Sequence, residues 1–586
     1  MRLFNNKGSG KYLFILLFIV FVGSLVRLWG IDFGLPHTQC RPDQYQCVLI
    51  LTAPLRNFHP RDFIYPSFYK YILLFVYAFY FIWGMVSGRF NSLNDFMAEF
   101  AIDPSVFYLI DRVLSAAFGV LTVVIIYYIA RRLFNEKIAV VSSFFLSLAY
   151  LHIKLSHFGG VDVPMTFFIM VSIFLILKCY ESKSLKDYFV SGICAGLAAS
   201  TKYPAALLIV TMFITHFLNC GELKEKKISC LLDKRITVFL FTFVLGFLAG
   251  TPFALIDLRN FIDTFFFAVK ATGVSSGNYI NPPKQAWWYH LSLTLFFGLG
   301  SPLLFASLAG IAVFFKMNWR KALLVFSFPV VYYSVFASGF VPMTRYMVPL
   351  VPFFCLTAAL FVCVFAEKIF RYFKIKPSMS VIYFTALLFI MPSLFNAVHF
   401  DRLLAKKDNR LVAGEWITKN IASGSSICQV IDNWYAELQL FPSRQYLTRK
   451  YNVVKEEIQR SGKGKFTLMD IEYKLDFLIN SNIMNYNEWT YDAKSNTFLF
   501  VDRKMDSLPD YIVTSDKDPG VLQSAVTDKL RKILLHSYHL KKAFIVNQME
   551  DKRNIYDRFD AFFLPFSGFK GVERPGPNFW IYERND

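Results

Sequence analysis

Uninterrupted apolar runs recur along this chain as far as Val398, and most have the length of about 17–25 residues that crosses a hydrocarbon layer as a helix. Of the 586 residues, 55% are hydrophobic and only 18% are charged, with 66 Phe and 31 Tyr. A water-soluble fold of this size could not cover so much apolar area with polar surface. The sequence therefore predicts a polytopic α-helical membrane protein.

The first apolar run, from Lys11 to Trp29, follows a basic start with Arg2 and Lys7. No small-x-small cleavage site follows it, so we expect a retained signal anchor with its N-terminus in the cytoplasm. The net charge of +20 would indicate nucleic-acid binding in a soluble chain. Here much of the charge lies in short turns between apolar runs, where it records topology, so we expect no nucleic acid as a partner.

The basic turns determine how many runs cross the membrane. The run Tyr71–Met85 is only about 15 residues long, which is typical of an interfacial or re-entrant segment. If it does not cross, all the basic turns lie on the side of the basic N-terminus, as the positive-inside rule requires. This gives about eleven spans, the last near Val381–Val398. The turns are Arg131–Lys137, Lys178–Asp187, Glu222–Arg235, Lys316–Lys321 and Glu367–Lys376.

The composition changes after His399, where charged residues become frequent and apolar runs shorten. "SSICQVID", "DYIVTSD", "KAFIVNQ" and "NFWIYER" are typical of buried strands, and "YNVVKEEIQRS" and "VLQSAVTDKLRKILLHSYHL" of amphipathic helices. This alternation predicts a small α/β domain. We expect a transmembrane domain over residues 1–399, with a first outer loop at 31–108, and an extracytoplasmic α/β domain over 400–586.

Polar residues that composition does not explain fall mostly on the outer side in this topology. An ionisable side chain at a membrane face is costly unless it meets water, a partner or a ligand, so their convergence predicts a shared polar cavity. They are Asp32, Arg41, Asp43, Arg56, His59, Arg61, Asp62, Lys70, Asp111, Arg112, His157, Asp162, Lys202, Asp257, Arg259, Arg345 and Tyr346.

Each of these residues also has a structural explanation. Asp43 follows Pro42, and an acid in a first helical turn favours the helix dipole. Asp162, two residues before Pro164, has the same explanation. Lys202 and Arg345 could extend to the interface as snorkelling side chains. His59 and His157 are more typical of surface or turn histidines than of metal ligands.

The nine cysteines are scattered without CxxC pairs, which indicates neither a zinc site nor a disulfide scaffold. Cys40 and Cys47 could form a disulfide in an oxidising compartment. A helix starting at Pro42 would place their Cα atoms too far apart for one. Both alternatives remain open from the sequence.

A series of motifs, in order along nearly the whole chain, resembles glycosyltransferase family 39, the protein O-mannosyltransferase and aminoarabinose-transferase relatives among the C-type membrane glycosyltransferases. Ser67 stands where that family usually has a second proline. The motifs are "RPDQYQ", "YPSFYKYIL", "DRVLSAAFGVLTVVIIYYIARRLF", "SHFGGVDVPMTFF", "GLAASTKYPAAL", "GTPFALID", "WWYHLSLTLFFGLGSPLLFASLAGI", "RYMVPLVPFF", "LVAGEWITKNIASGSSI" and "PGPNFWIYER".

The resemblance implies a polyprenyl-phosphate-linked monosaccharide as donor, used on the extracytoplasmic face of the cell membrane. It implies that the acid of the first loop, Asp43, is catalytic and that Asp162 is the second acid. Lys202 and Arg345 match motifs that contact the donor phosphate or the cavity. The acceptor would be a lipid, a glycan or a protein.

The chemistry of glycosyl transfer needs the same residue types. A carboxylate can take the proton of an acceptor hydroxyl as the new bond forms, and Asp43 is our candidate for this base, with inversion at the anomeric carbon. Cations near a low-dielectric bilayer stabilise a leaving phosphate. We expect no obligatory metal cofactor, although a divalent ion is possible. Candidates for phosphate contact are Arg41, Lys202, Arg345 and Lys70, and candidates to line the cavity are Tyr45, His157, Asp257 and Tyr346.

Two other classes of protein fit parts of the sequence. A multispan transporter or lipid flippase would line its path with buried charges, but such proteins often consist of two matching halves, which this sequence does not show. A receptor or assembly scaffold would not need so many acids and bases around the first loop. The sequence therefore favours an enzyme, a membrane glycosyltransferase.

Overall fold

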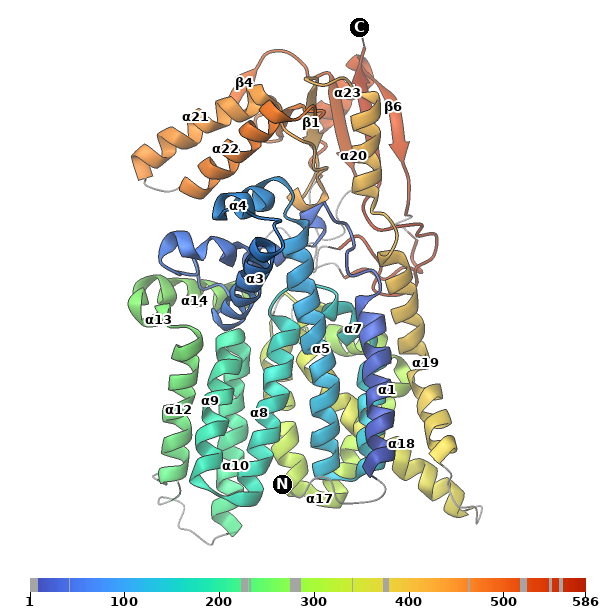
Figure 1. Ribbon diagram of the computed structural model, residues 1–586. Helices are drawn as coiled ribbons and strands as arrows, with labels where there is room; N and C mark the ends of the chain where they lie inside the picture. The colour runs from blue at the N-terminus through green and yellow to red at the C-terminus, as the bar shows by residue number, and fades with distance from the viewer. Residues whose placement is uncertain are drawn as a thin grey trace.

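The computed structural model describes residues 9–41, 43–222, 230, 233–273, 286–339, 341–372, 379–461, 464–516, 524–547, 551–557 and 562–585. A helical bundle carries the N-terminus at one end and a mixed α/β domain with the C-terminus at the other (Figure 1). The helices of the bundle are α1 (Ser9–Leu28), α5 (Ser105–Leu133), α6 (Glu136–Leu148), α7 (Tyr150–Ser156), α8 (Asp162–Ser182), α9 (Leu185–Thr201), α10 (Leu208–Glu222), α12 (Lys234–Gly250), α17 (Ser301–Ala337), α18 (Val351–Tyr372) and α19 (Met379–Leu404).

Eight helices in the described part are long and apolar enough to span a membrane, or nine if the bent pair α6 and α7 forms one span. The helices α9 and α12, of 17 residues each, are slightly shorter. Non-helical backbone at Asn318 divides α17 into two arms. Counting the α6–α7 pair as one span, both arms of α17 and the two shorter helices, and leaving out α3 (Phe68–Val86), which is one of the eight, gives the predicted number of about eleven.

Helix α3 has 19 residues, more than the roughly 15 expected for a segment that does not cross, and by length and composition it is one of the eight candidate spans. It lies beyond the ends of α9 and α12, on the side of the C-terminal domain (Figure 1). Its first turn meets those ends, because the backbone N–H of Ser67 donates to Thr251 Oγ1 at 3.1 Å. Shorter helices gather at the same end: α2 (Gln44–Val48), α4 (Leu93–Ile102), α13 (Phe253–Ile256), α14 (Leu258–Gly273), α15 (Trp287–Tyr289), α16 (Phe296–Leu299), the π-helix η4 (His290–Leu295) and the 3-10 helices η1 (Thr38–Cys40), η2 (Leu49–Arg56), η3 (Tyr203–Leu207) and η5 (Thr344–Leu350).

Small residues and side-chain caps explain how the bundle packs. A Cβ added to Gly196 would lie 2.1 Å from the carbonyl oxygen of Phe243, and one on Gly246 would lie 2.4 Å from that of Ile193. Glycine at these positions lets α9 and α12 approach closely, as small residues do between membrane helices. Asn135 caps α6 by accepting a hydrogen bond from the N–H of Ile138 at 3.0 Å.

The C-terminal part forms a seven-stranded mixed sheet in the order β4-β3-β2-β1-β5-β7-β6. β1 is parallel to β2 and β5, whereas β7 is antiparallel to β5 and β6. The sheet confirms the expectation of a C-terminal α/β domain. Its elements are α20 (Asn409–Asn420), β1 (Ser426–Val430), the 3-10 helix η6 (Trp434–Ala436), α21 (Arg444–Ser461), α22 (Lys465–Asn480), β2 (Asn487–Asp492), β3 (Thr497–Phe500), β4 (Arg503–Met505), β5 (Tyr511–Ser515), α23 (Asp528–Ser537), β6 (Tyr538–Phe544) and β7 (Phe579–Arg584).

One helix prediction in this domain is wrong at its end. "VLQSAVTDKLRKILLHSYHL" was expected to be a single helix, but α23 covers only Asp528–Ser537, and the chain enters β6 at Tyr538. Thr527 sets the start, because its side chain caps the N–H of Leu530 at 3.2 Å. β6 extends the sheet at the edge of β7, and this tertiary pairing overrides the helical pattern of its first residues.

The C-terminal domain packs directly on the bundle. His37 Nε2, in the first loop, lies 2.5 Å from the carbonyl oxygen of Glu437. Asp557 Oδ2, between β6 and β7, accepts from the N–H of Thr344 at 3.2 Å, and Phe562 packs on Phe158 with ring centroids 5.0 Å apart. The segment between β6 and β7 therefore covers the bundle end where the first loop lies.

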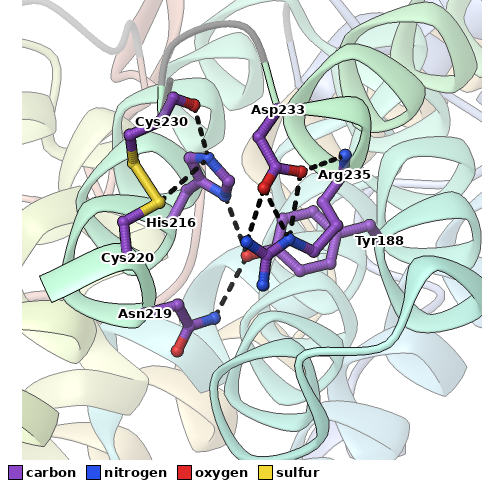
Figure 2. Close-up of a disulfide and its surroundings, with 7 residues drawn as sticks. All are labelled: Tyr188, His216, Asn219, Cys220, Cys230, Asp233 and Arg235. Carbon is purple, nitrogen blue, oxygen red and sulfur yellow. Dashed lines mark hydrogen bonds and ion pairs between the residues drawn. A yellow bond between two sulfur atoms is a disulfide. The ribbon is translucent and has the colours of Figure 1, made fainter. Parts of the chain in front are cut away.

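The cysteines differ from the sequence expectation in one respect. Cys220 and Cys230 form a disulfide, whereas the scattered spacing indicated none (Figure 2). Cys40 and Cys47 are both free and buried, which settles the alternative that the sequence left open. Most of the basic turn at Glu222–Arg235 lies outside the described residues.

Candidate active site

A small cavity, partly open to solvent, lies at the end of the bundle that faces the C-terminal domain. The first loop supplies one wall, the turn between α7 and α8 supplies another, and η5 supplies Arg345. Phe158, in the second wall, is the residue that packs on Phe562. The charged side chains that line the cavity, together with the phenol of Tyr65, are Arg41, Asp43, Asp162 and Arg345.

Asp43 directs its carboxylate to a cation rather than to a helix end. It precedes α2 in a left-handed conformation, with φ at 69°, and its side chain makes no capping hydrogen bond. Arg345 Nη1 instead donates to Asp43 Oδ2 at 2.7 Å. A left-handed aspartate costs backbone energy that the surroundings must offset. Asp43 therefore precedes the helix, whereas the structural explanation from the sequence placed it in the first turn.

Residues of α5 hold the loop that carries Asp43. Arg112 donates through Nε to Gln44 Oε1 at 3.1 Å, next to Asp43 in sequence. The same guanidinium donates through Nη1 to the carbonyl oxygens of Ile31 at 3.0 Å and Phe33 at 2.7 Å. Charge-assisted bonds of this kind are strong in a buried site. Arg112 is therefore a positioning residue for the first loop.

A glycine is required where α5 meets the turn before α8. A Cβ on Gly159 would lie 2.0 Å from Asp111 Oδ2 and 2.5 Å from Gln44 Nε2. Asp111 is fixed in turn by the hydroxyl of Tyr69, which donates to Oδ1 at 2.6 Å. The close approach brings the turn that ends at Asp162 beside the loop that carries Asp43.

Asp162 and Lys202 form a second ion pair near the cavity. Lys202 Nζ, at the C-terminal end of α9, lies 2.6 Å from Asp162 Oδ1, at the first residue of α8. The ammonium group also lies 5.5 Å from the ring centroid of Tyr65 and 5.6 Å from that of Tyr346. Lys202 therefore contacts a carboxylate and two aromatic faces instead of extending to lipid.

The surrounding cations determine the charge of Asp43. Burial alone would raise its pKa, but Arg345, with smaller effects from Arg41 and Lys202, lowers the pKa below the ordinary value of aspartate. Burial, together with the charge of Asp43, raises the pKa of Tyr65 well above that of a free phenol. The cavity therefore combines an ionised carboxylate with a phenolic donor and several cations.

Several predicted site residues lie elsewhere in the structure and do not line this cavity. Tyr346 is nevertheless close, beside Lys202. Tyr45 accepts a hydrogen bond from Gln46 Nε2 at 2.6 Å, and Lys70 Nζ lies 3.4 Å from Asp62 Oδ1. His157 is buried, with Nε2 3.1 Å from the carbonyl oxygen of Trp29, and Asp257 pairs with His59 at 3.1 Å.

Two features of the cavity were missed by sequence reasoning. Tyr65 stands at the start of "YPSFYKYIL", which was used only as a family motif. The pair Gly159–Gly160, in "HFGGVDVP", signals a backbone that another group approaches closely or that adopts positive φ, and Gly160 has φ at 130°. That signal was present in the sequence but was not used.

Part of the chain is similar in sequence to known proteins. Residues 110–249 match the family model for dolichyl-phosphate-mannose-protein mannosyltransferase. An uncharacterised protein of Aquifex aeolicus is 31% identical over 115 residues, which are 20% of this chain and 23% of that protein. The matched region thus spans less than a quarter of that relative's length.

Two solved structures are similar over most of the chain. ArnT from Cupriavidus metallidurans, in a structure bound to undecaprenyl phosphate, is 11% identical with a TM-score of 0.50, covering 92% of this chain and 97% of ArnT. The oligosaccharyltransferase AglB from Archaeoglobus fulgidus, in complex with an inhibitory peptide and a dolichol-phosphate, is 12% identical with a TM-score of 0.49, covering 99% and 89%.

The family match falls on the segment that carries Asp111, Asp162 and Lys202. It agrees with the resemblance that the sequence motifs show, and the likeness to ArnT extends the agreement to the fold. Over residues 110–249 the chain is therefore similar to the dolichyl-phosphate-mannose-protein mannosyltransferase family, and its overall fold is similar to that of ArnT.

Proposed function

We propose that this protein is a membrane glycosyltransferase that moves a monosaccharide from a polyprenyl-phosphate donor to an acceptor hydroxyl, with inversion. The observation that carries the proposal is the pairing of Asp43 with Arg345 in a cavity that also contains Asp162 and Arg41. The family match and the fold shared with ArnT, which binds undecaprenyl phosphate, support the choice of donor.

In the proposed reaction, the acceptor oxygen attacks the anomeric carbon of the donor sugar. The bond from that carbon to the phosphate oxygen breaks, and the polyprenyl phosphate leaves with the electron pair. Asp43 takes the proton of the acceptor hydroxyl as the new bond forms. Asp162 positions hydroxyl groups of the sugar or the acceptor, and Tyr65, which stays protonated, donates to an oxygen of the same substrates.

The ion pair between Arg345 and Asp43 would allow a bound donor to activate the base, Asp43. Without donor, its guanidinium holds the carboxylate of Asp43 at 2.7 Å. A phosphate is a strong partner for a guanidinium, so a bound donor draws Arg345 away and leaves Asp43 free to accept a proton. Arg41 and Lys202 add positive charge for the leaving phosphate. With these cations, the reaction needs no divalent ion, and we expect transfer to persist in excess EDTA.

We further propose that the cavity and the C-terminal domain lie on the extracytoplasmic side of the cell membrane. Arg131, Arg132 and the middle of α17 lie toward the N-terminal end of the bundle, opposite the cavity, as the positive-inside rule requires. An impermeant maleimide should label a cysteine placed at exposed Lys494 in intact cells of a cysteine-free variant. Labelling only after cell lysis would overturn this orientation.

The proposed activity can be tested with the purified protein in liposomes that contain the native acceptor lipids or envelope glycans. With polyprenyl-phosphate sugars extracted from the same cells, we expect loss of donor to match the release of polyprenyl phosphate. The matching nucleotide sugars should give no product, because the proposed donor is a lipid phosphate and not a nucleotide. Movement of the intact donor across the bilayer without loss of its sugar would instead identify a flippase.

A further inference from the structure

A cluster of metal-binding side chains lies at the opposite end of the bundle from the cavity. His216 and Cys220 are on α10, and Cys230 lies between α10 and α12 in the sequence. One ligand atom from each lies within 4.8 Å of the other two, and all three residues are buried. Figure 2 shows the imidazole directed toward the disulfide that joins the two cysteines.

We propose that, when this disulfide is reduced, His216, Cys220 and Cys230 bind one zinc-class divalent ion. His216 and Cys220 are four residues apart, so they lie on one face of α10. Their ligand atoms, His216 Nε2 and Cys220 Sγ, are 3.5 Å apart. Imidazole nitrogen and thiolate sulfur are the ligands that zinc prefers, and two thiolates cancel the charge of the ion, which suits a buried site.

The surroundings of His216 hold the ring for this role. Its Nδ1 lies 3.1 Å from the hydroxyl of Tyr188, which also accepts from Asn219 Nδ2 at 3.1 Å. A ligating histidine characteristically donates its other ring nitrogen to such a partner, which fixes the tautomer and the orientation of the ring. With the disulfide closed, Nε2 donates to the carbonyl oxygen of Cys230, so Nδ1 accepts from the hydroxyl of Tyr188. Metal binding at Nε2 would place the ring proton on Nδ1, which would then donate to the Tyr188 oxygen.

Metal binding would displace one existing contact. His216 Nε2 lies 2.9 Å from the carbonyl oxygen of Cys230 and would leave it for the ion. That oxygen keeps a partner, because the N–H of Asp233 also donates to it at 3.3 Å. The carboxylate of Asp233 is held by Arg235, so the described residues supply three ligands and water completes a tetrahedral shell.

The disulfide and the metal are alternative links between α10 and α12. A dithiol reductant opens the disulfide and is itself oxidised to a disulfide. Two electrons and two protons pass from it to Cys220 and Cys230. Zinc then displaces both protons from the thiols. The positive-inside rule places this end of the bundle in the cytoplasm, where disulfides are rare and thiols stay reduced. The metal form is accordingly the one that we expect in the cell.

The test uses the full-length protein in detergent, reduced with a phosphine. The disulfide takes two electrons from phosphorus, and water supplies the oxygen of the phosphine oxide and the two thiol protons. Co²⁺ alone, added after the phosphine is removed, should give thiolate-to-cobalt charge-transfer absorption and tetrahedral visible bands at one ion per chain. Zn²⁺ should abolish both. The unreduced protein should give neither, which provides a comparison that needs no variant.

Variants distinguish this site from other thiols of the chain. Cys220→Ser and His216→Ala should each weaken cobalt binding by at least about tenfold, and Tyr188→Phe by about 10–100-fold, because it removes the partner that orients the ring. Cys194→Ser, on α9 and outside the cluster, should bind as the wild type does. Absence of cobalt–thiolate absorption in the reduced wild type, or cobalt binding by Cys220→Ser with wild-type affinity, would overturn the proposal.

Discussion

Replacing Asp43 with asparagine should reduce transfer by about 10²–10⁴-fold, which is the contribution that a positioned general base makes. Asparagine has nearly the same shape as aspartate and keeps an oxygen that can accept a hydrogen bond from Arg345. In the wild type, Arg345 Nη1 lies 2.7 Å from Asp43 Oδ2. The fold and the donor affinity should therefore change little. The measurement is the initial rate of polyprenyl phosphate release at saturating donor.

Asp263→Asn provides a matched control, because it removes an exposed carboxylate of α14 outside the cavity. This variant should transfer at the wild-type rate. Asp43→Asn should also retain the thermal unfolding temperature of the wild type in detergent. If Asp43→Asn folded normally and transferred sugar at the rate of Asp263→Asn, Asp43 would not be the base.

Arg345→Ala should have the second largest effect, a loss of about 10²–10³-fold, because one preorganised charge at the leaving phosphate is removed. Arg345→Lys should recover only part of the rate, since lysine is a point charge without the bidentate fork of arginine. Arg460→Ala, at a highly exposed position in α21, serves as the control and should have no effect.

The pH dependence separates a role in catalysis from a role in folding. Arg345 is the main cation that lowers the pKa of Asp43, so the wild-type carboxylate stays charged at pH values where an ordinary aspartate begins to protonate. Loss of Arg345 raises that pKa in the donor-free enzyme, so the acidic limb of the kcat/KM profile should move to higher pH. An unshifted limb in Arg345→Ala would mean that Asp43 does not titrate in that limb.

Much of the fold could be predicted because its signals are local. Apolar length indicated most of the spans. Charge bias assigned Tyr71–Met85 to a segment that does not cross, and α3 lies beyond the ends of α9 and α12, although its length would allow it to span. The strands at Ser426–Val430 and Phe579–Arg584 followed from apolar runs between turn residues. The end of α23 could not be predicted, because pairing of β6 with β7 depends on residues far apart in the chain.

The candidate site, like the fold, could be predicted only in part from the sequence. Sequence reasoning selected Asp43, Asp162, Lys202 and Arg345 as residues that composition does not explain, but it could not pair them. The partner of Asp43 is 302 residues away, on η5, and only tertiary structure brings the two together. Histidine and aspartate are common catalytic residue types. In this structure, however, His157 contacts the carbonyl oxygen of Trp29, and Asp257 pairs with His59.

The most direct measurement of the central claim is a cryo-EM structure of this protein with undecaprenyl phosphate added in excess. The claim predicts the phosphate in the cavity, within hydrogen-bond distance of Arg345, with the carboxylate of Asp43 released from that guanidinium. A lipid phosphate bound away from the cavity, with the Asp43–Arg345 pair still closed, would contradict it.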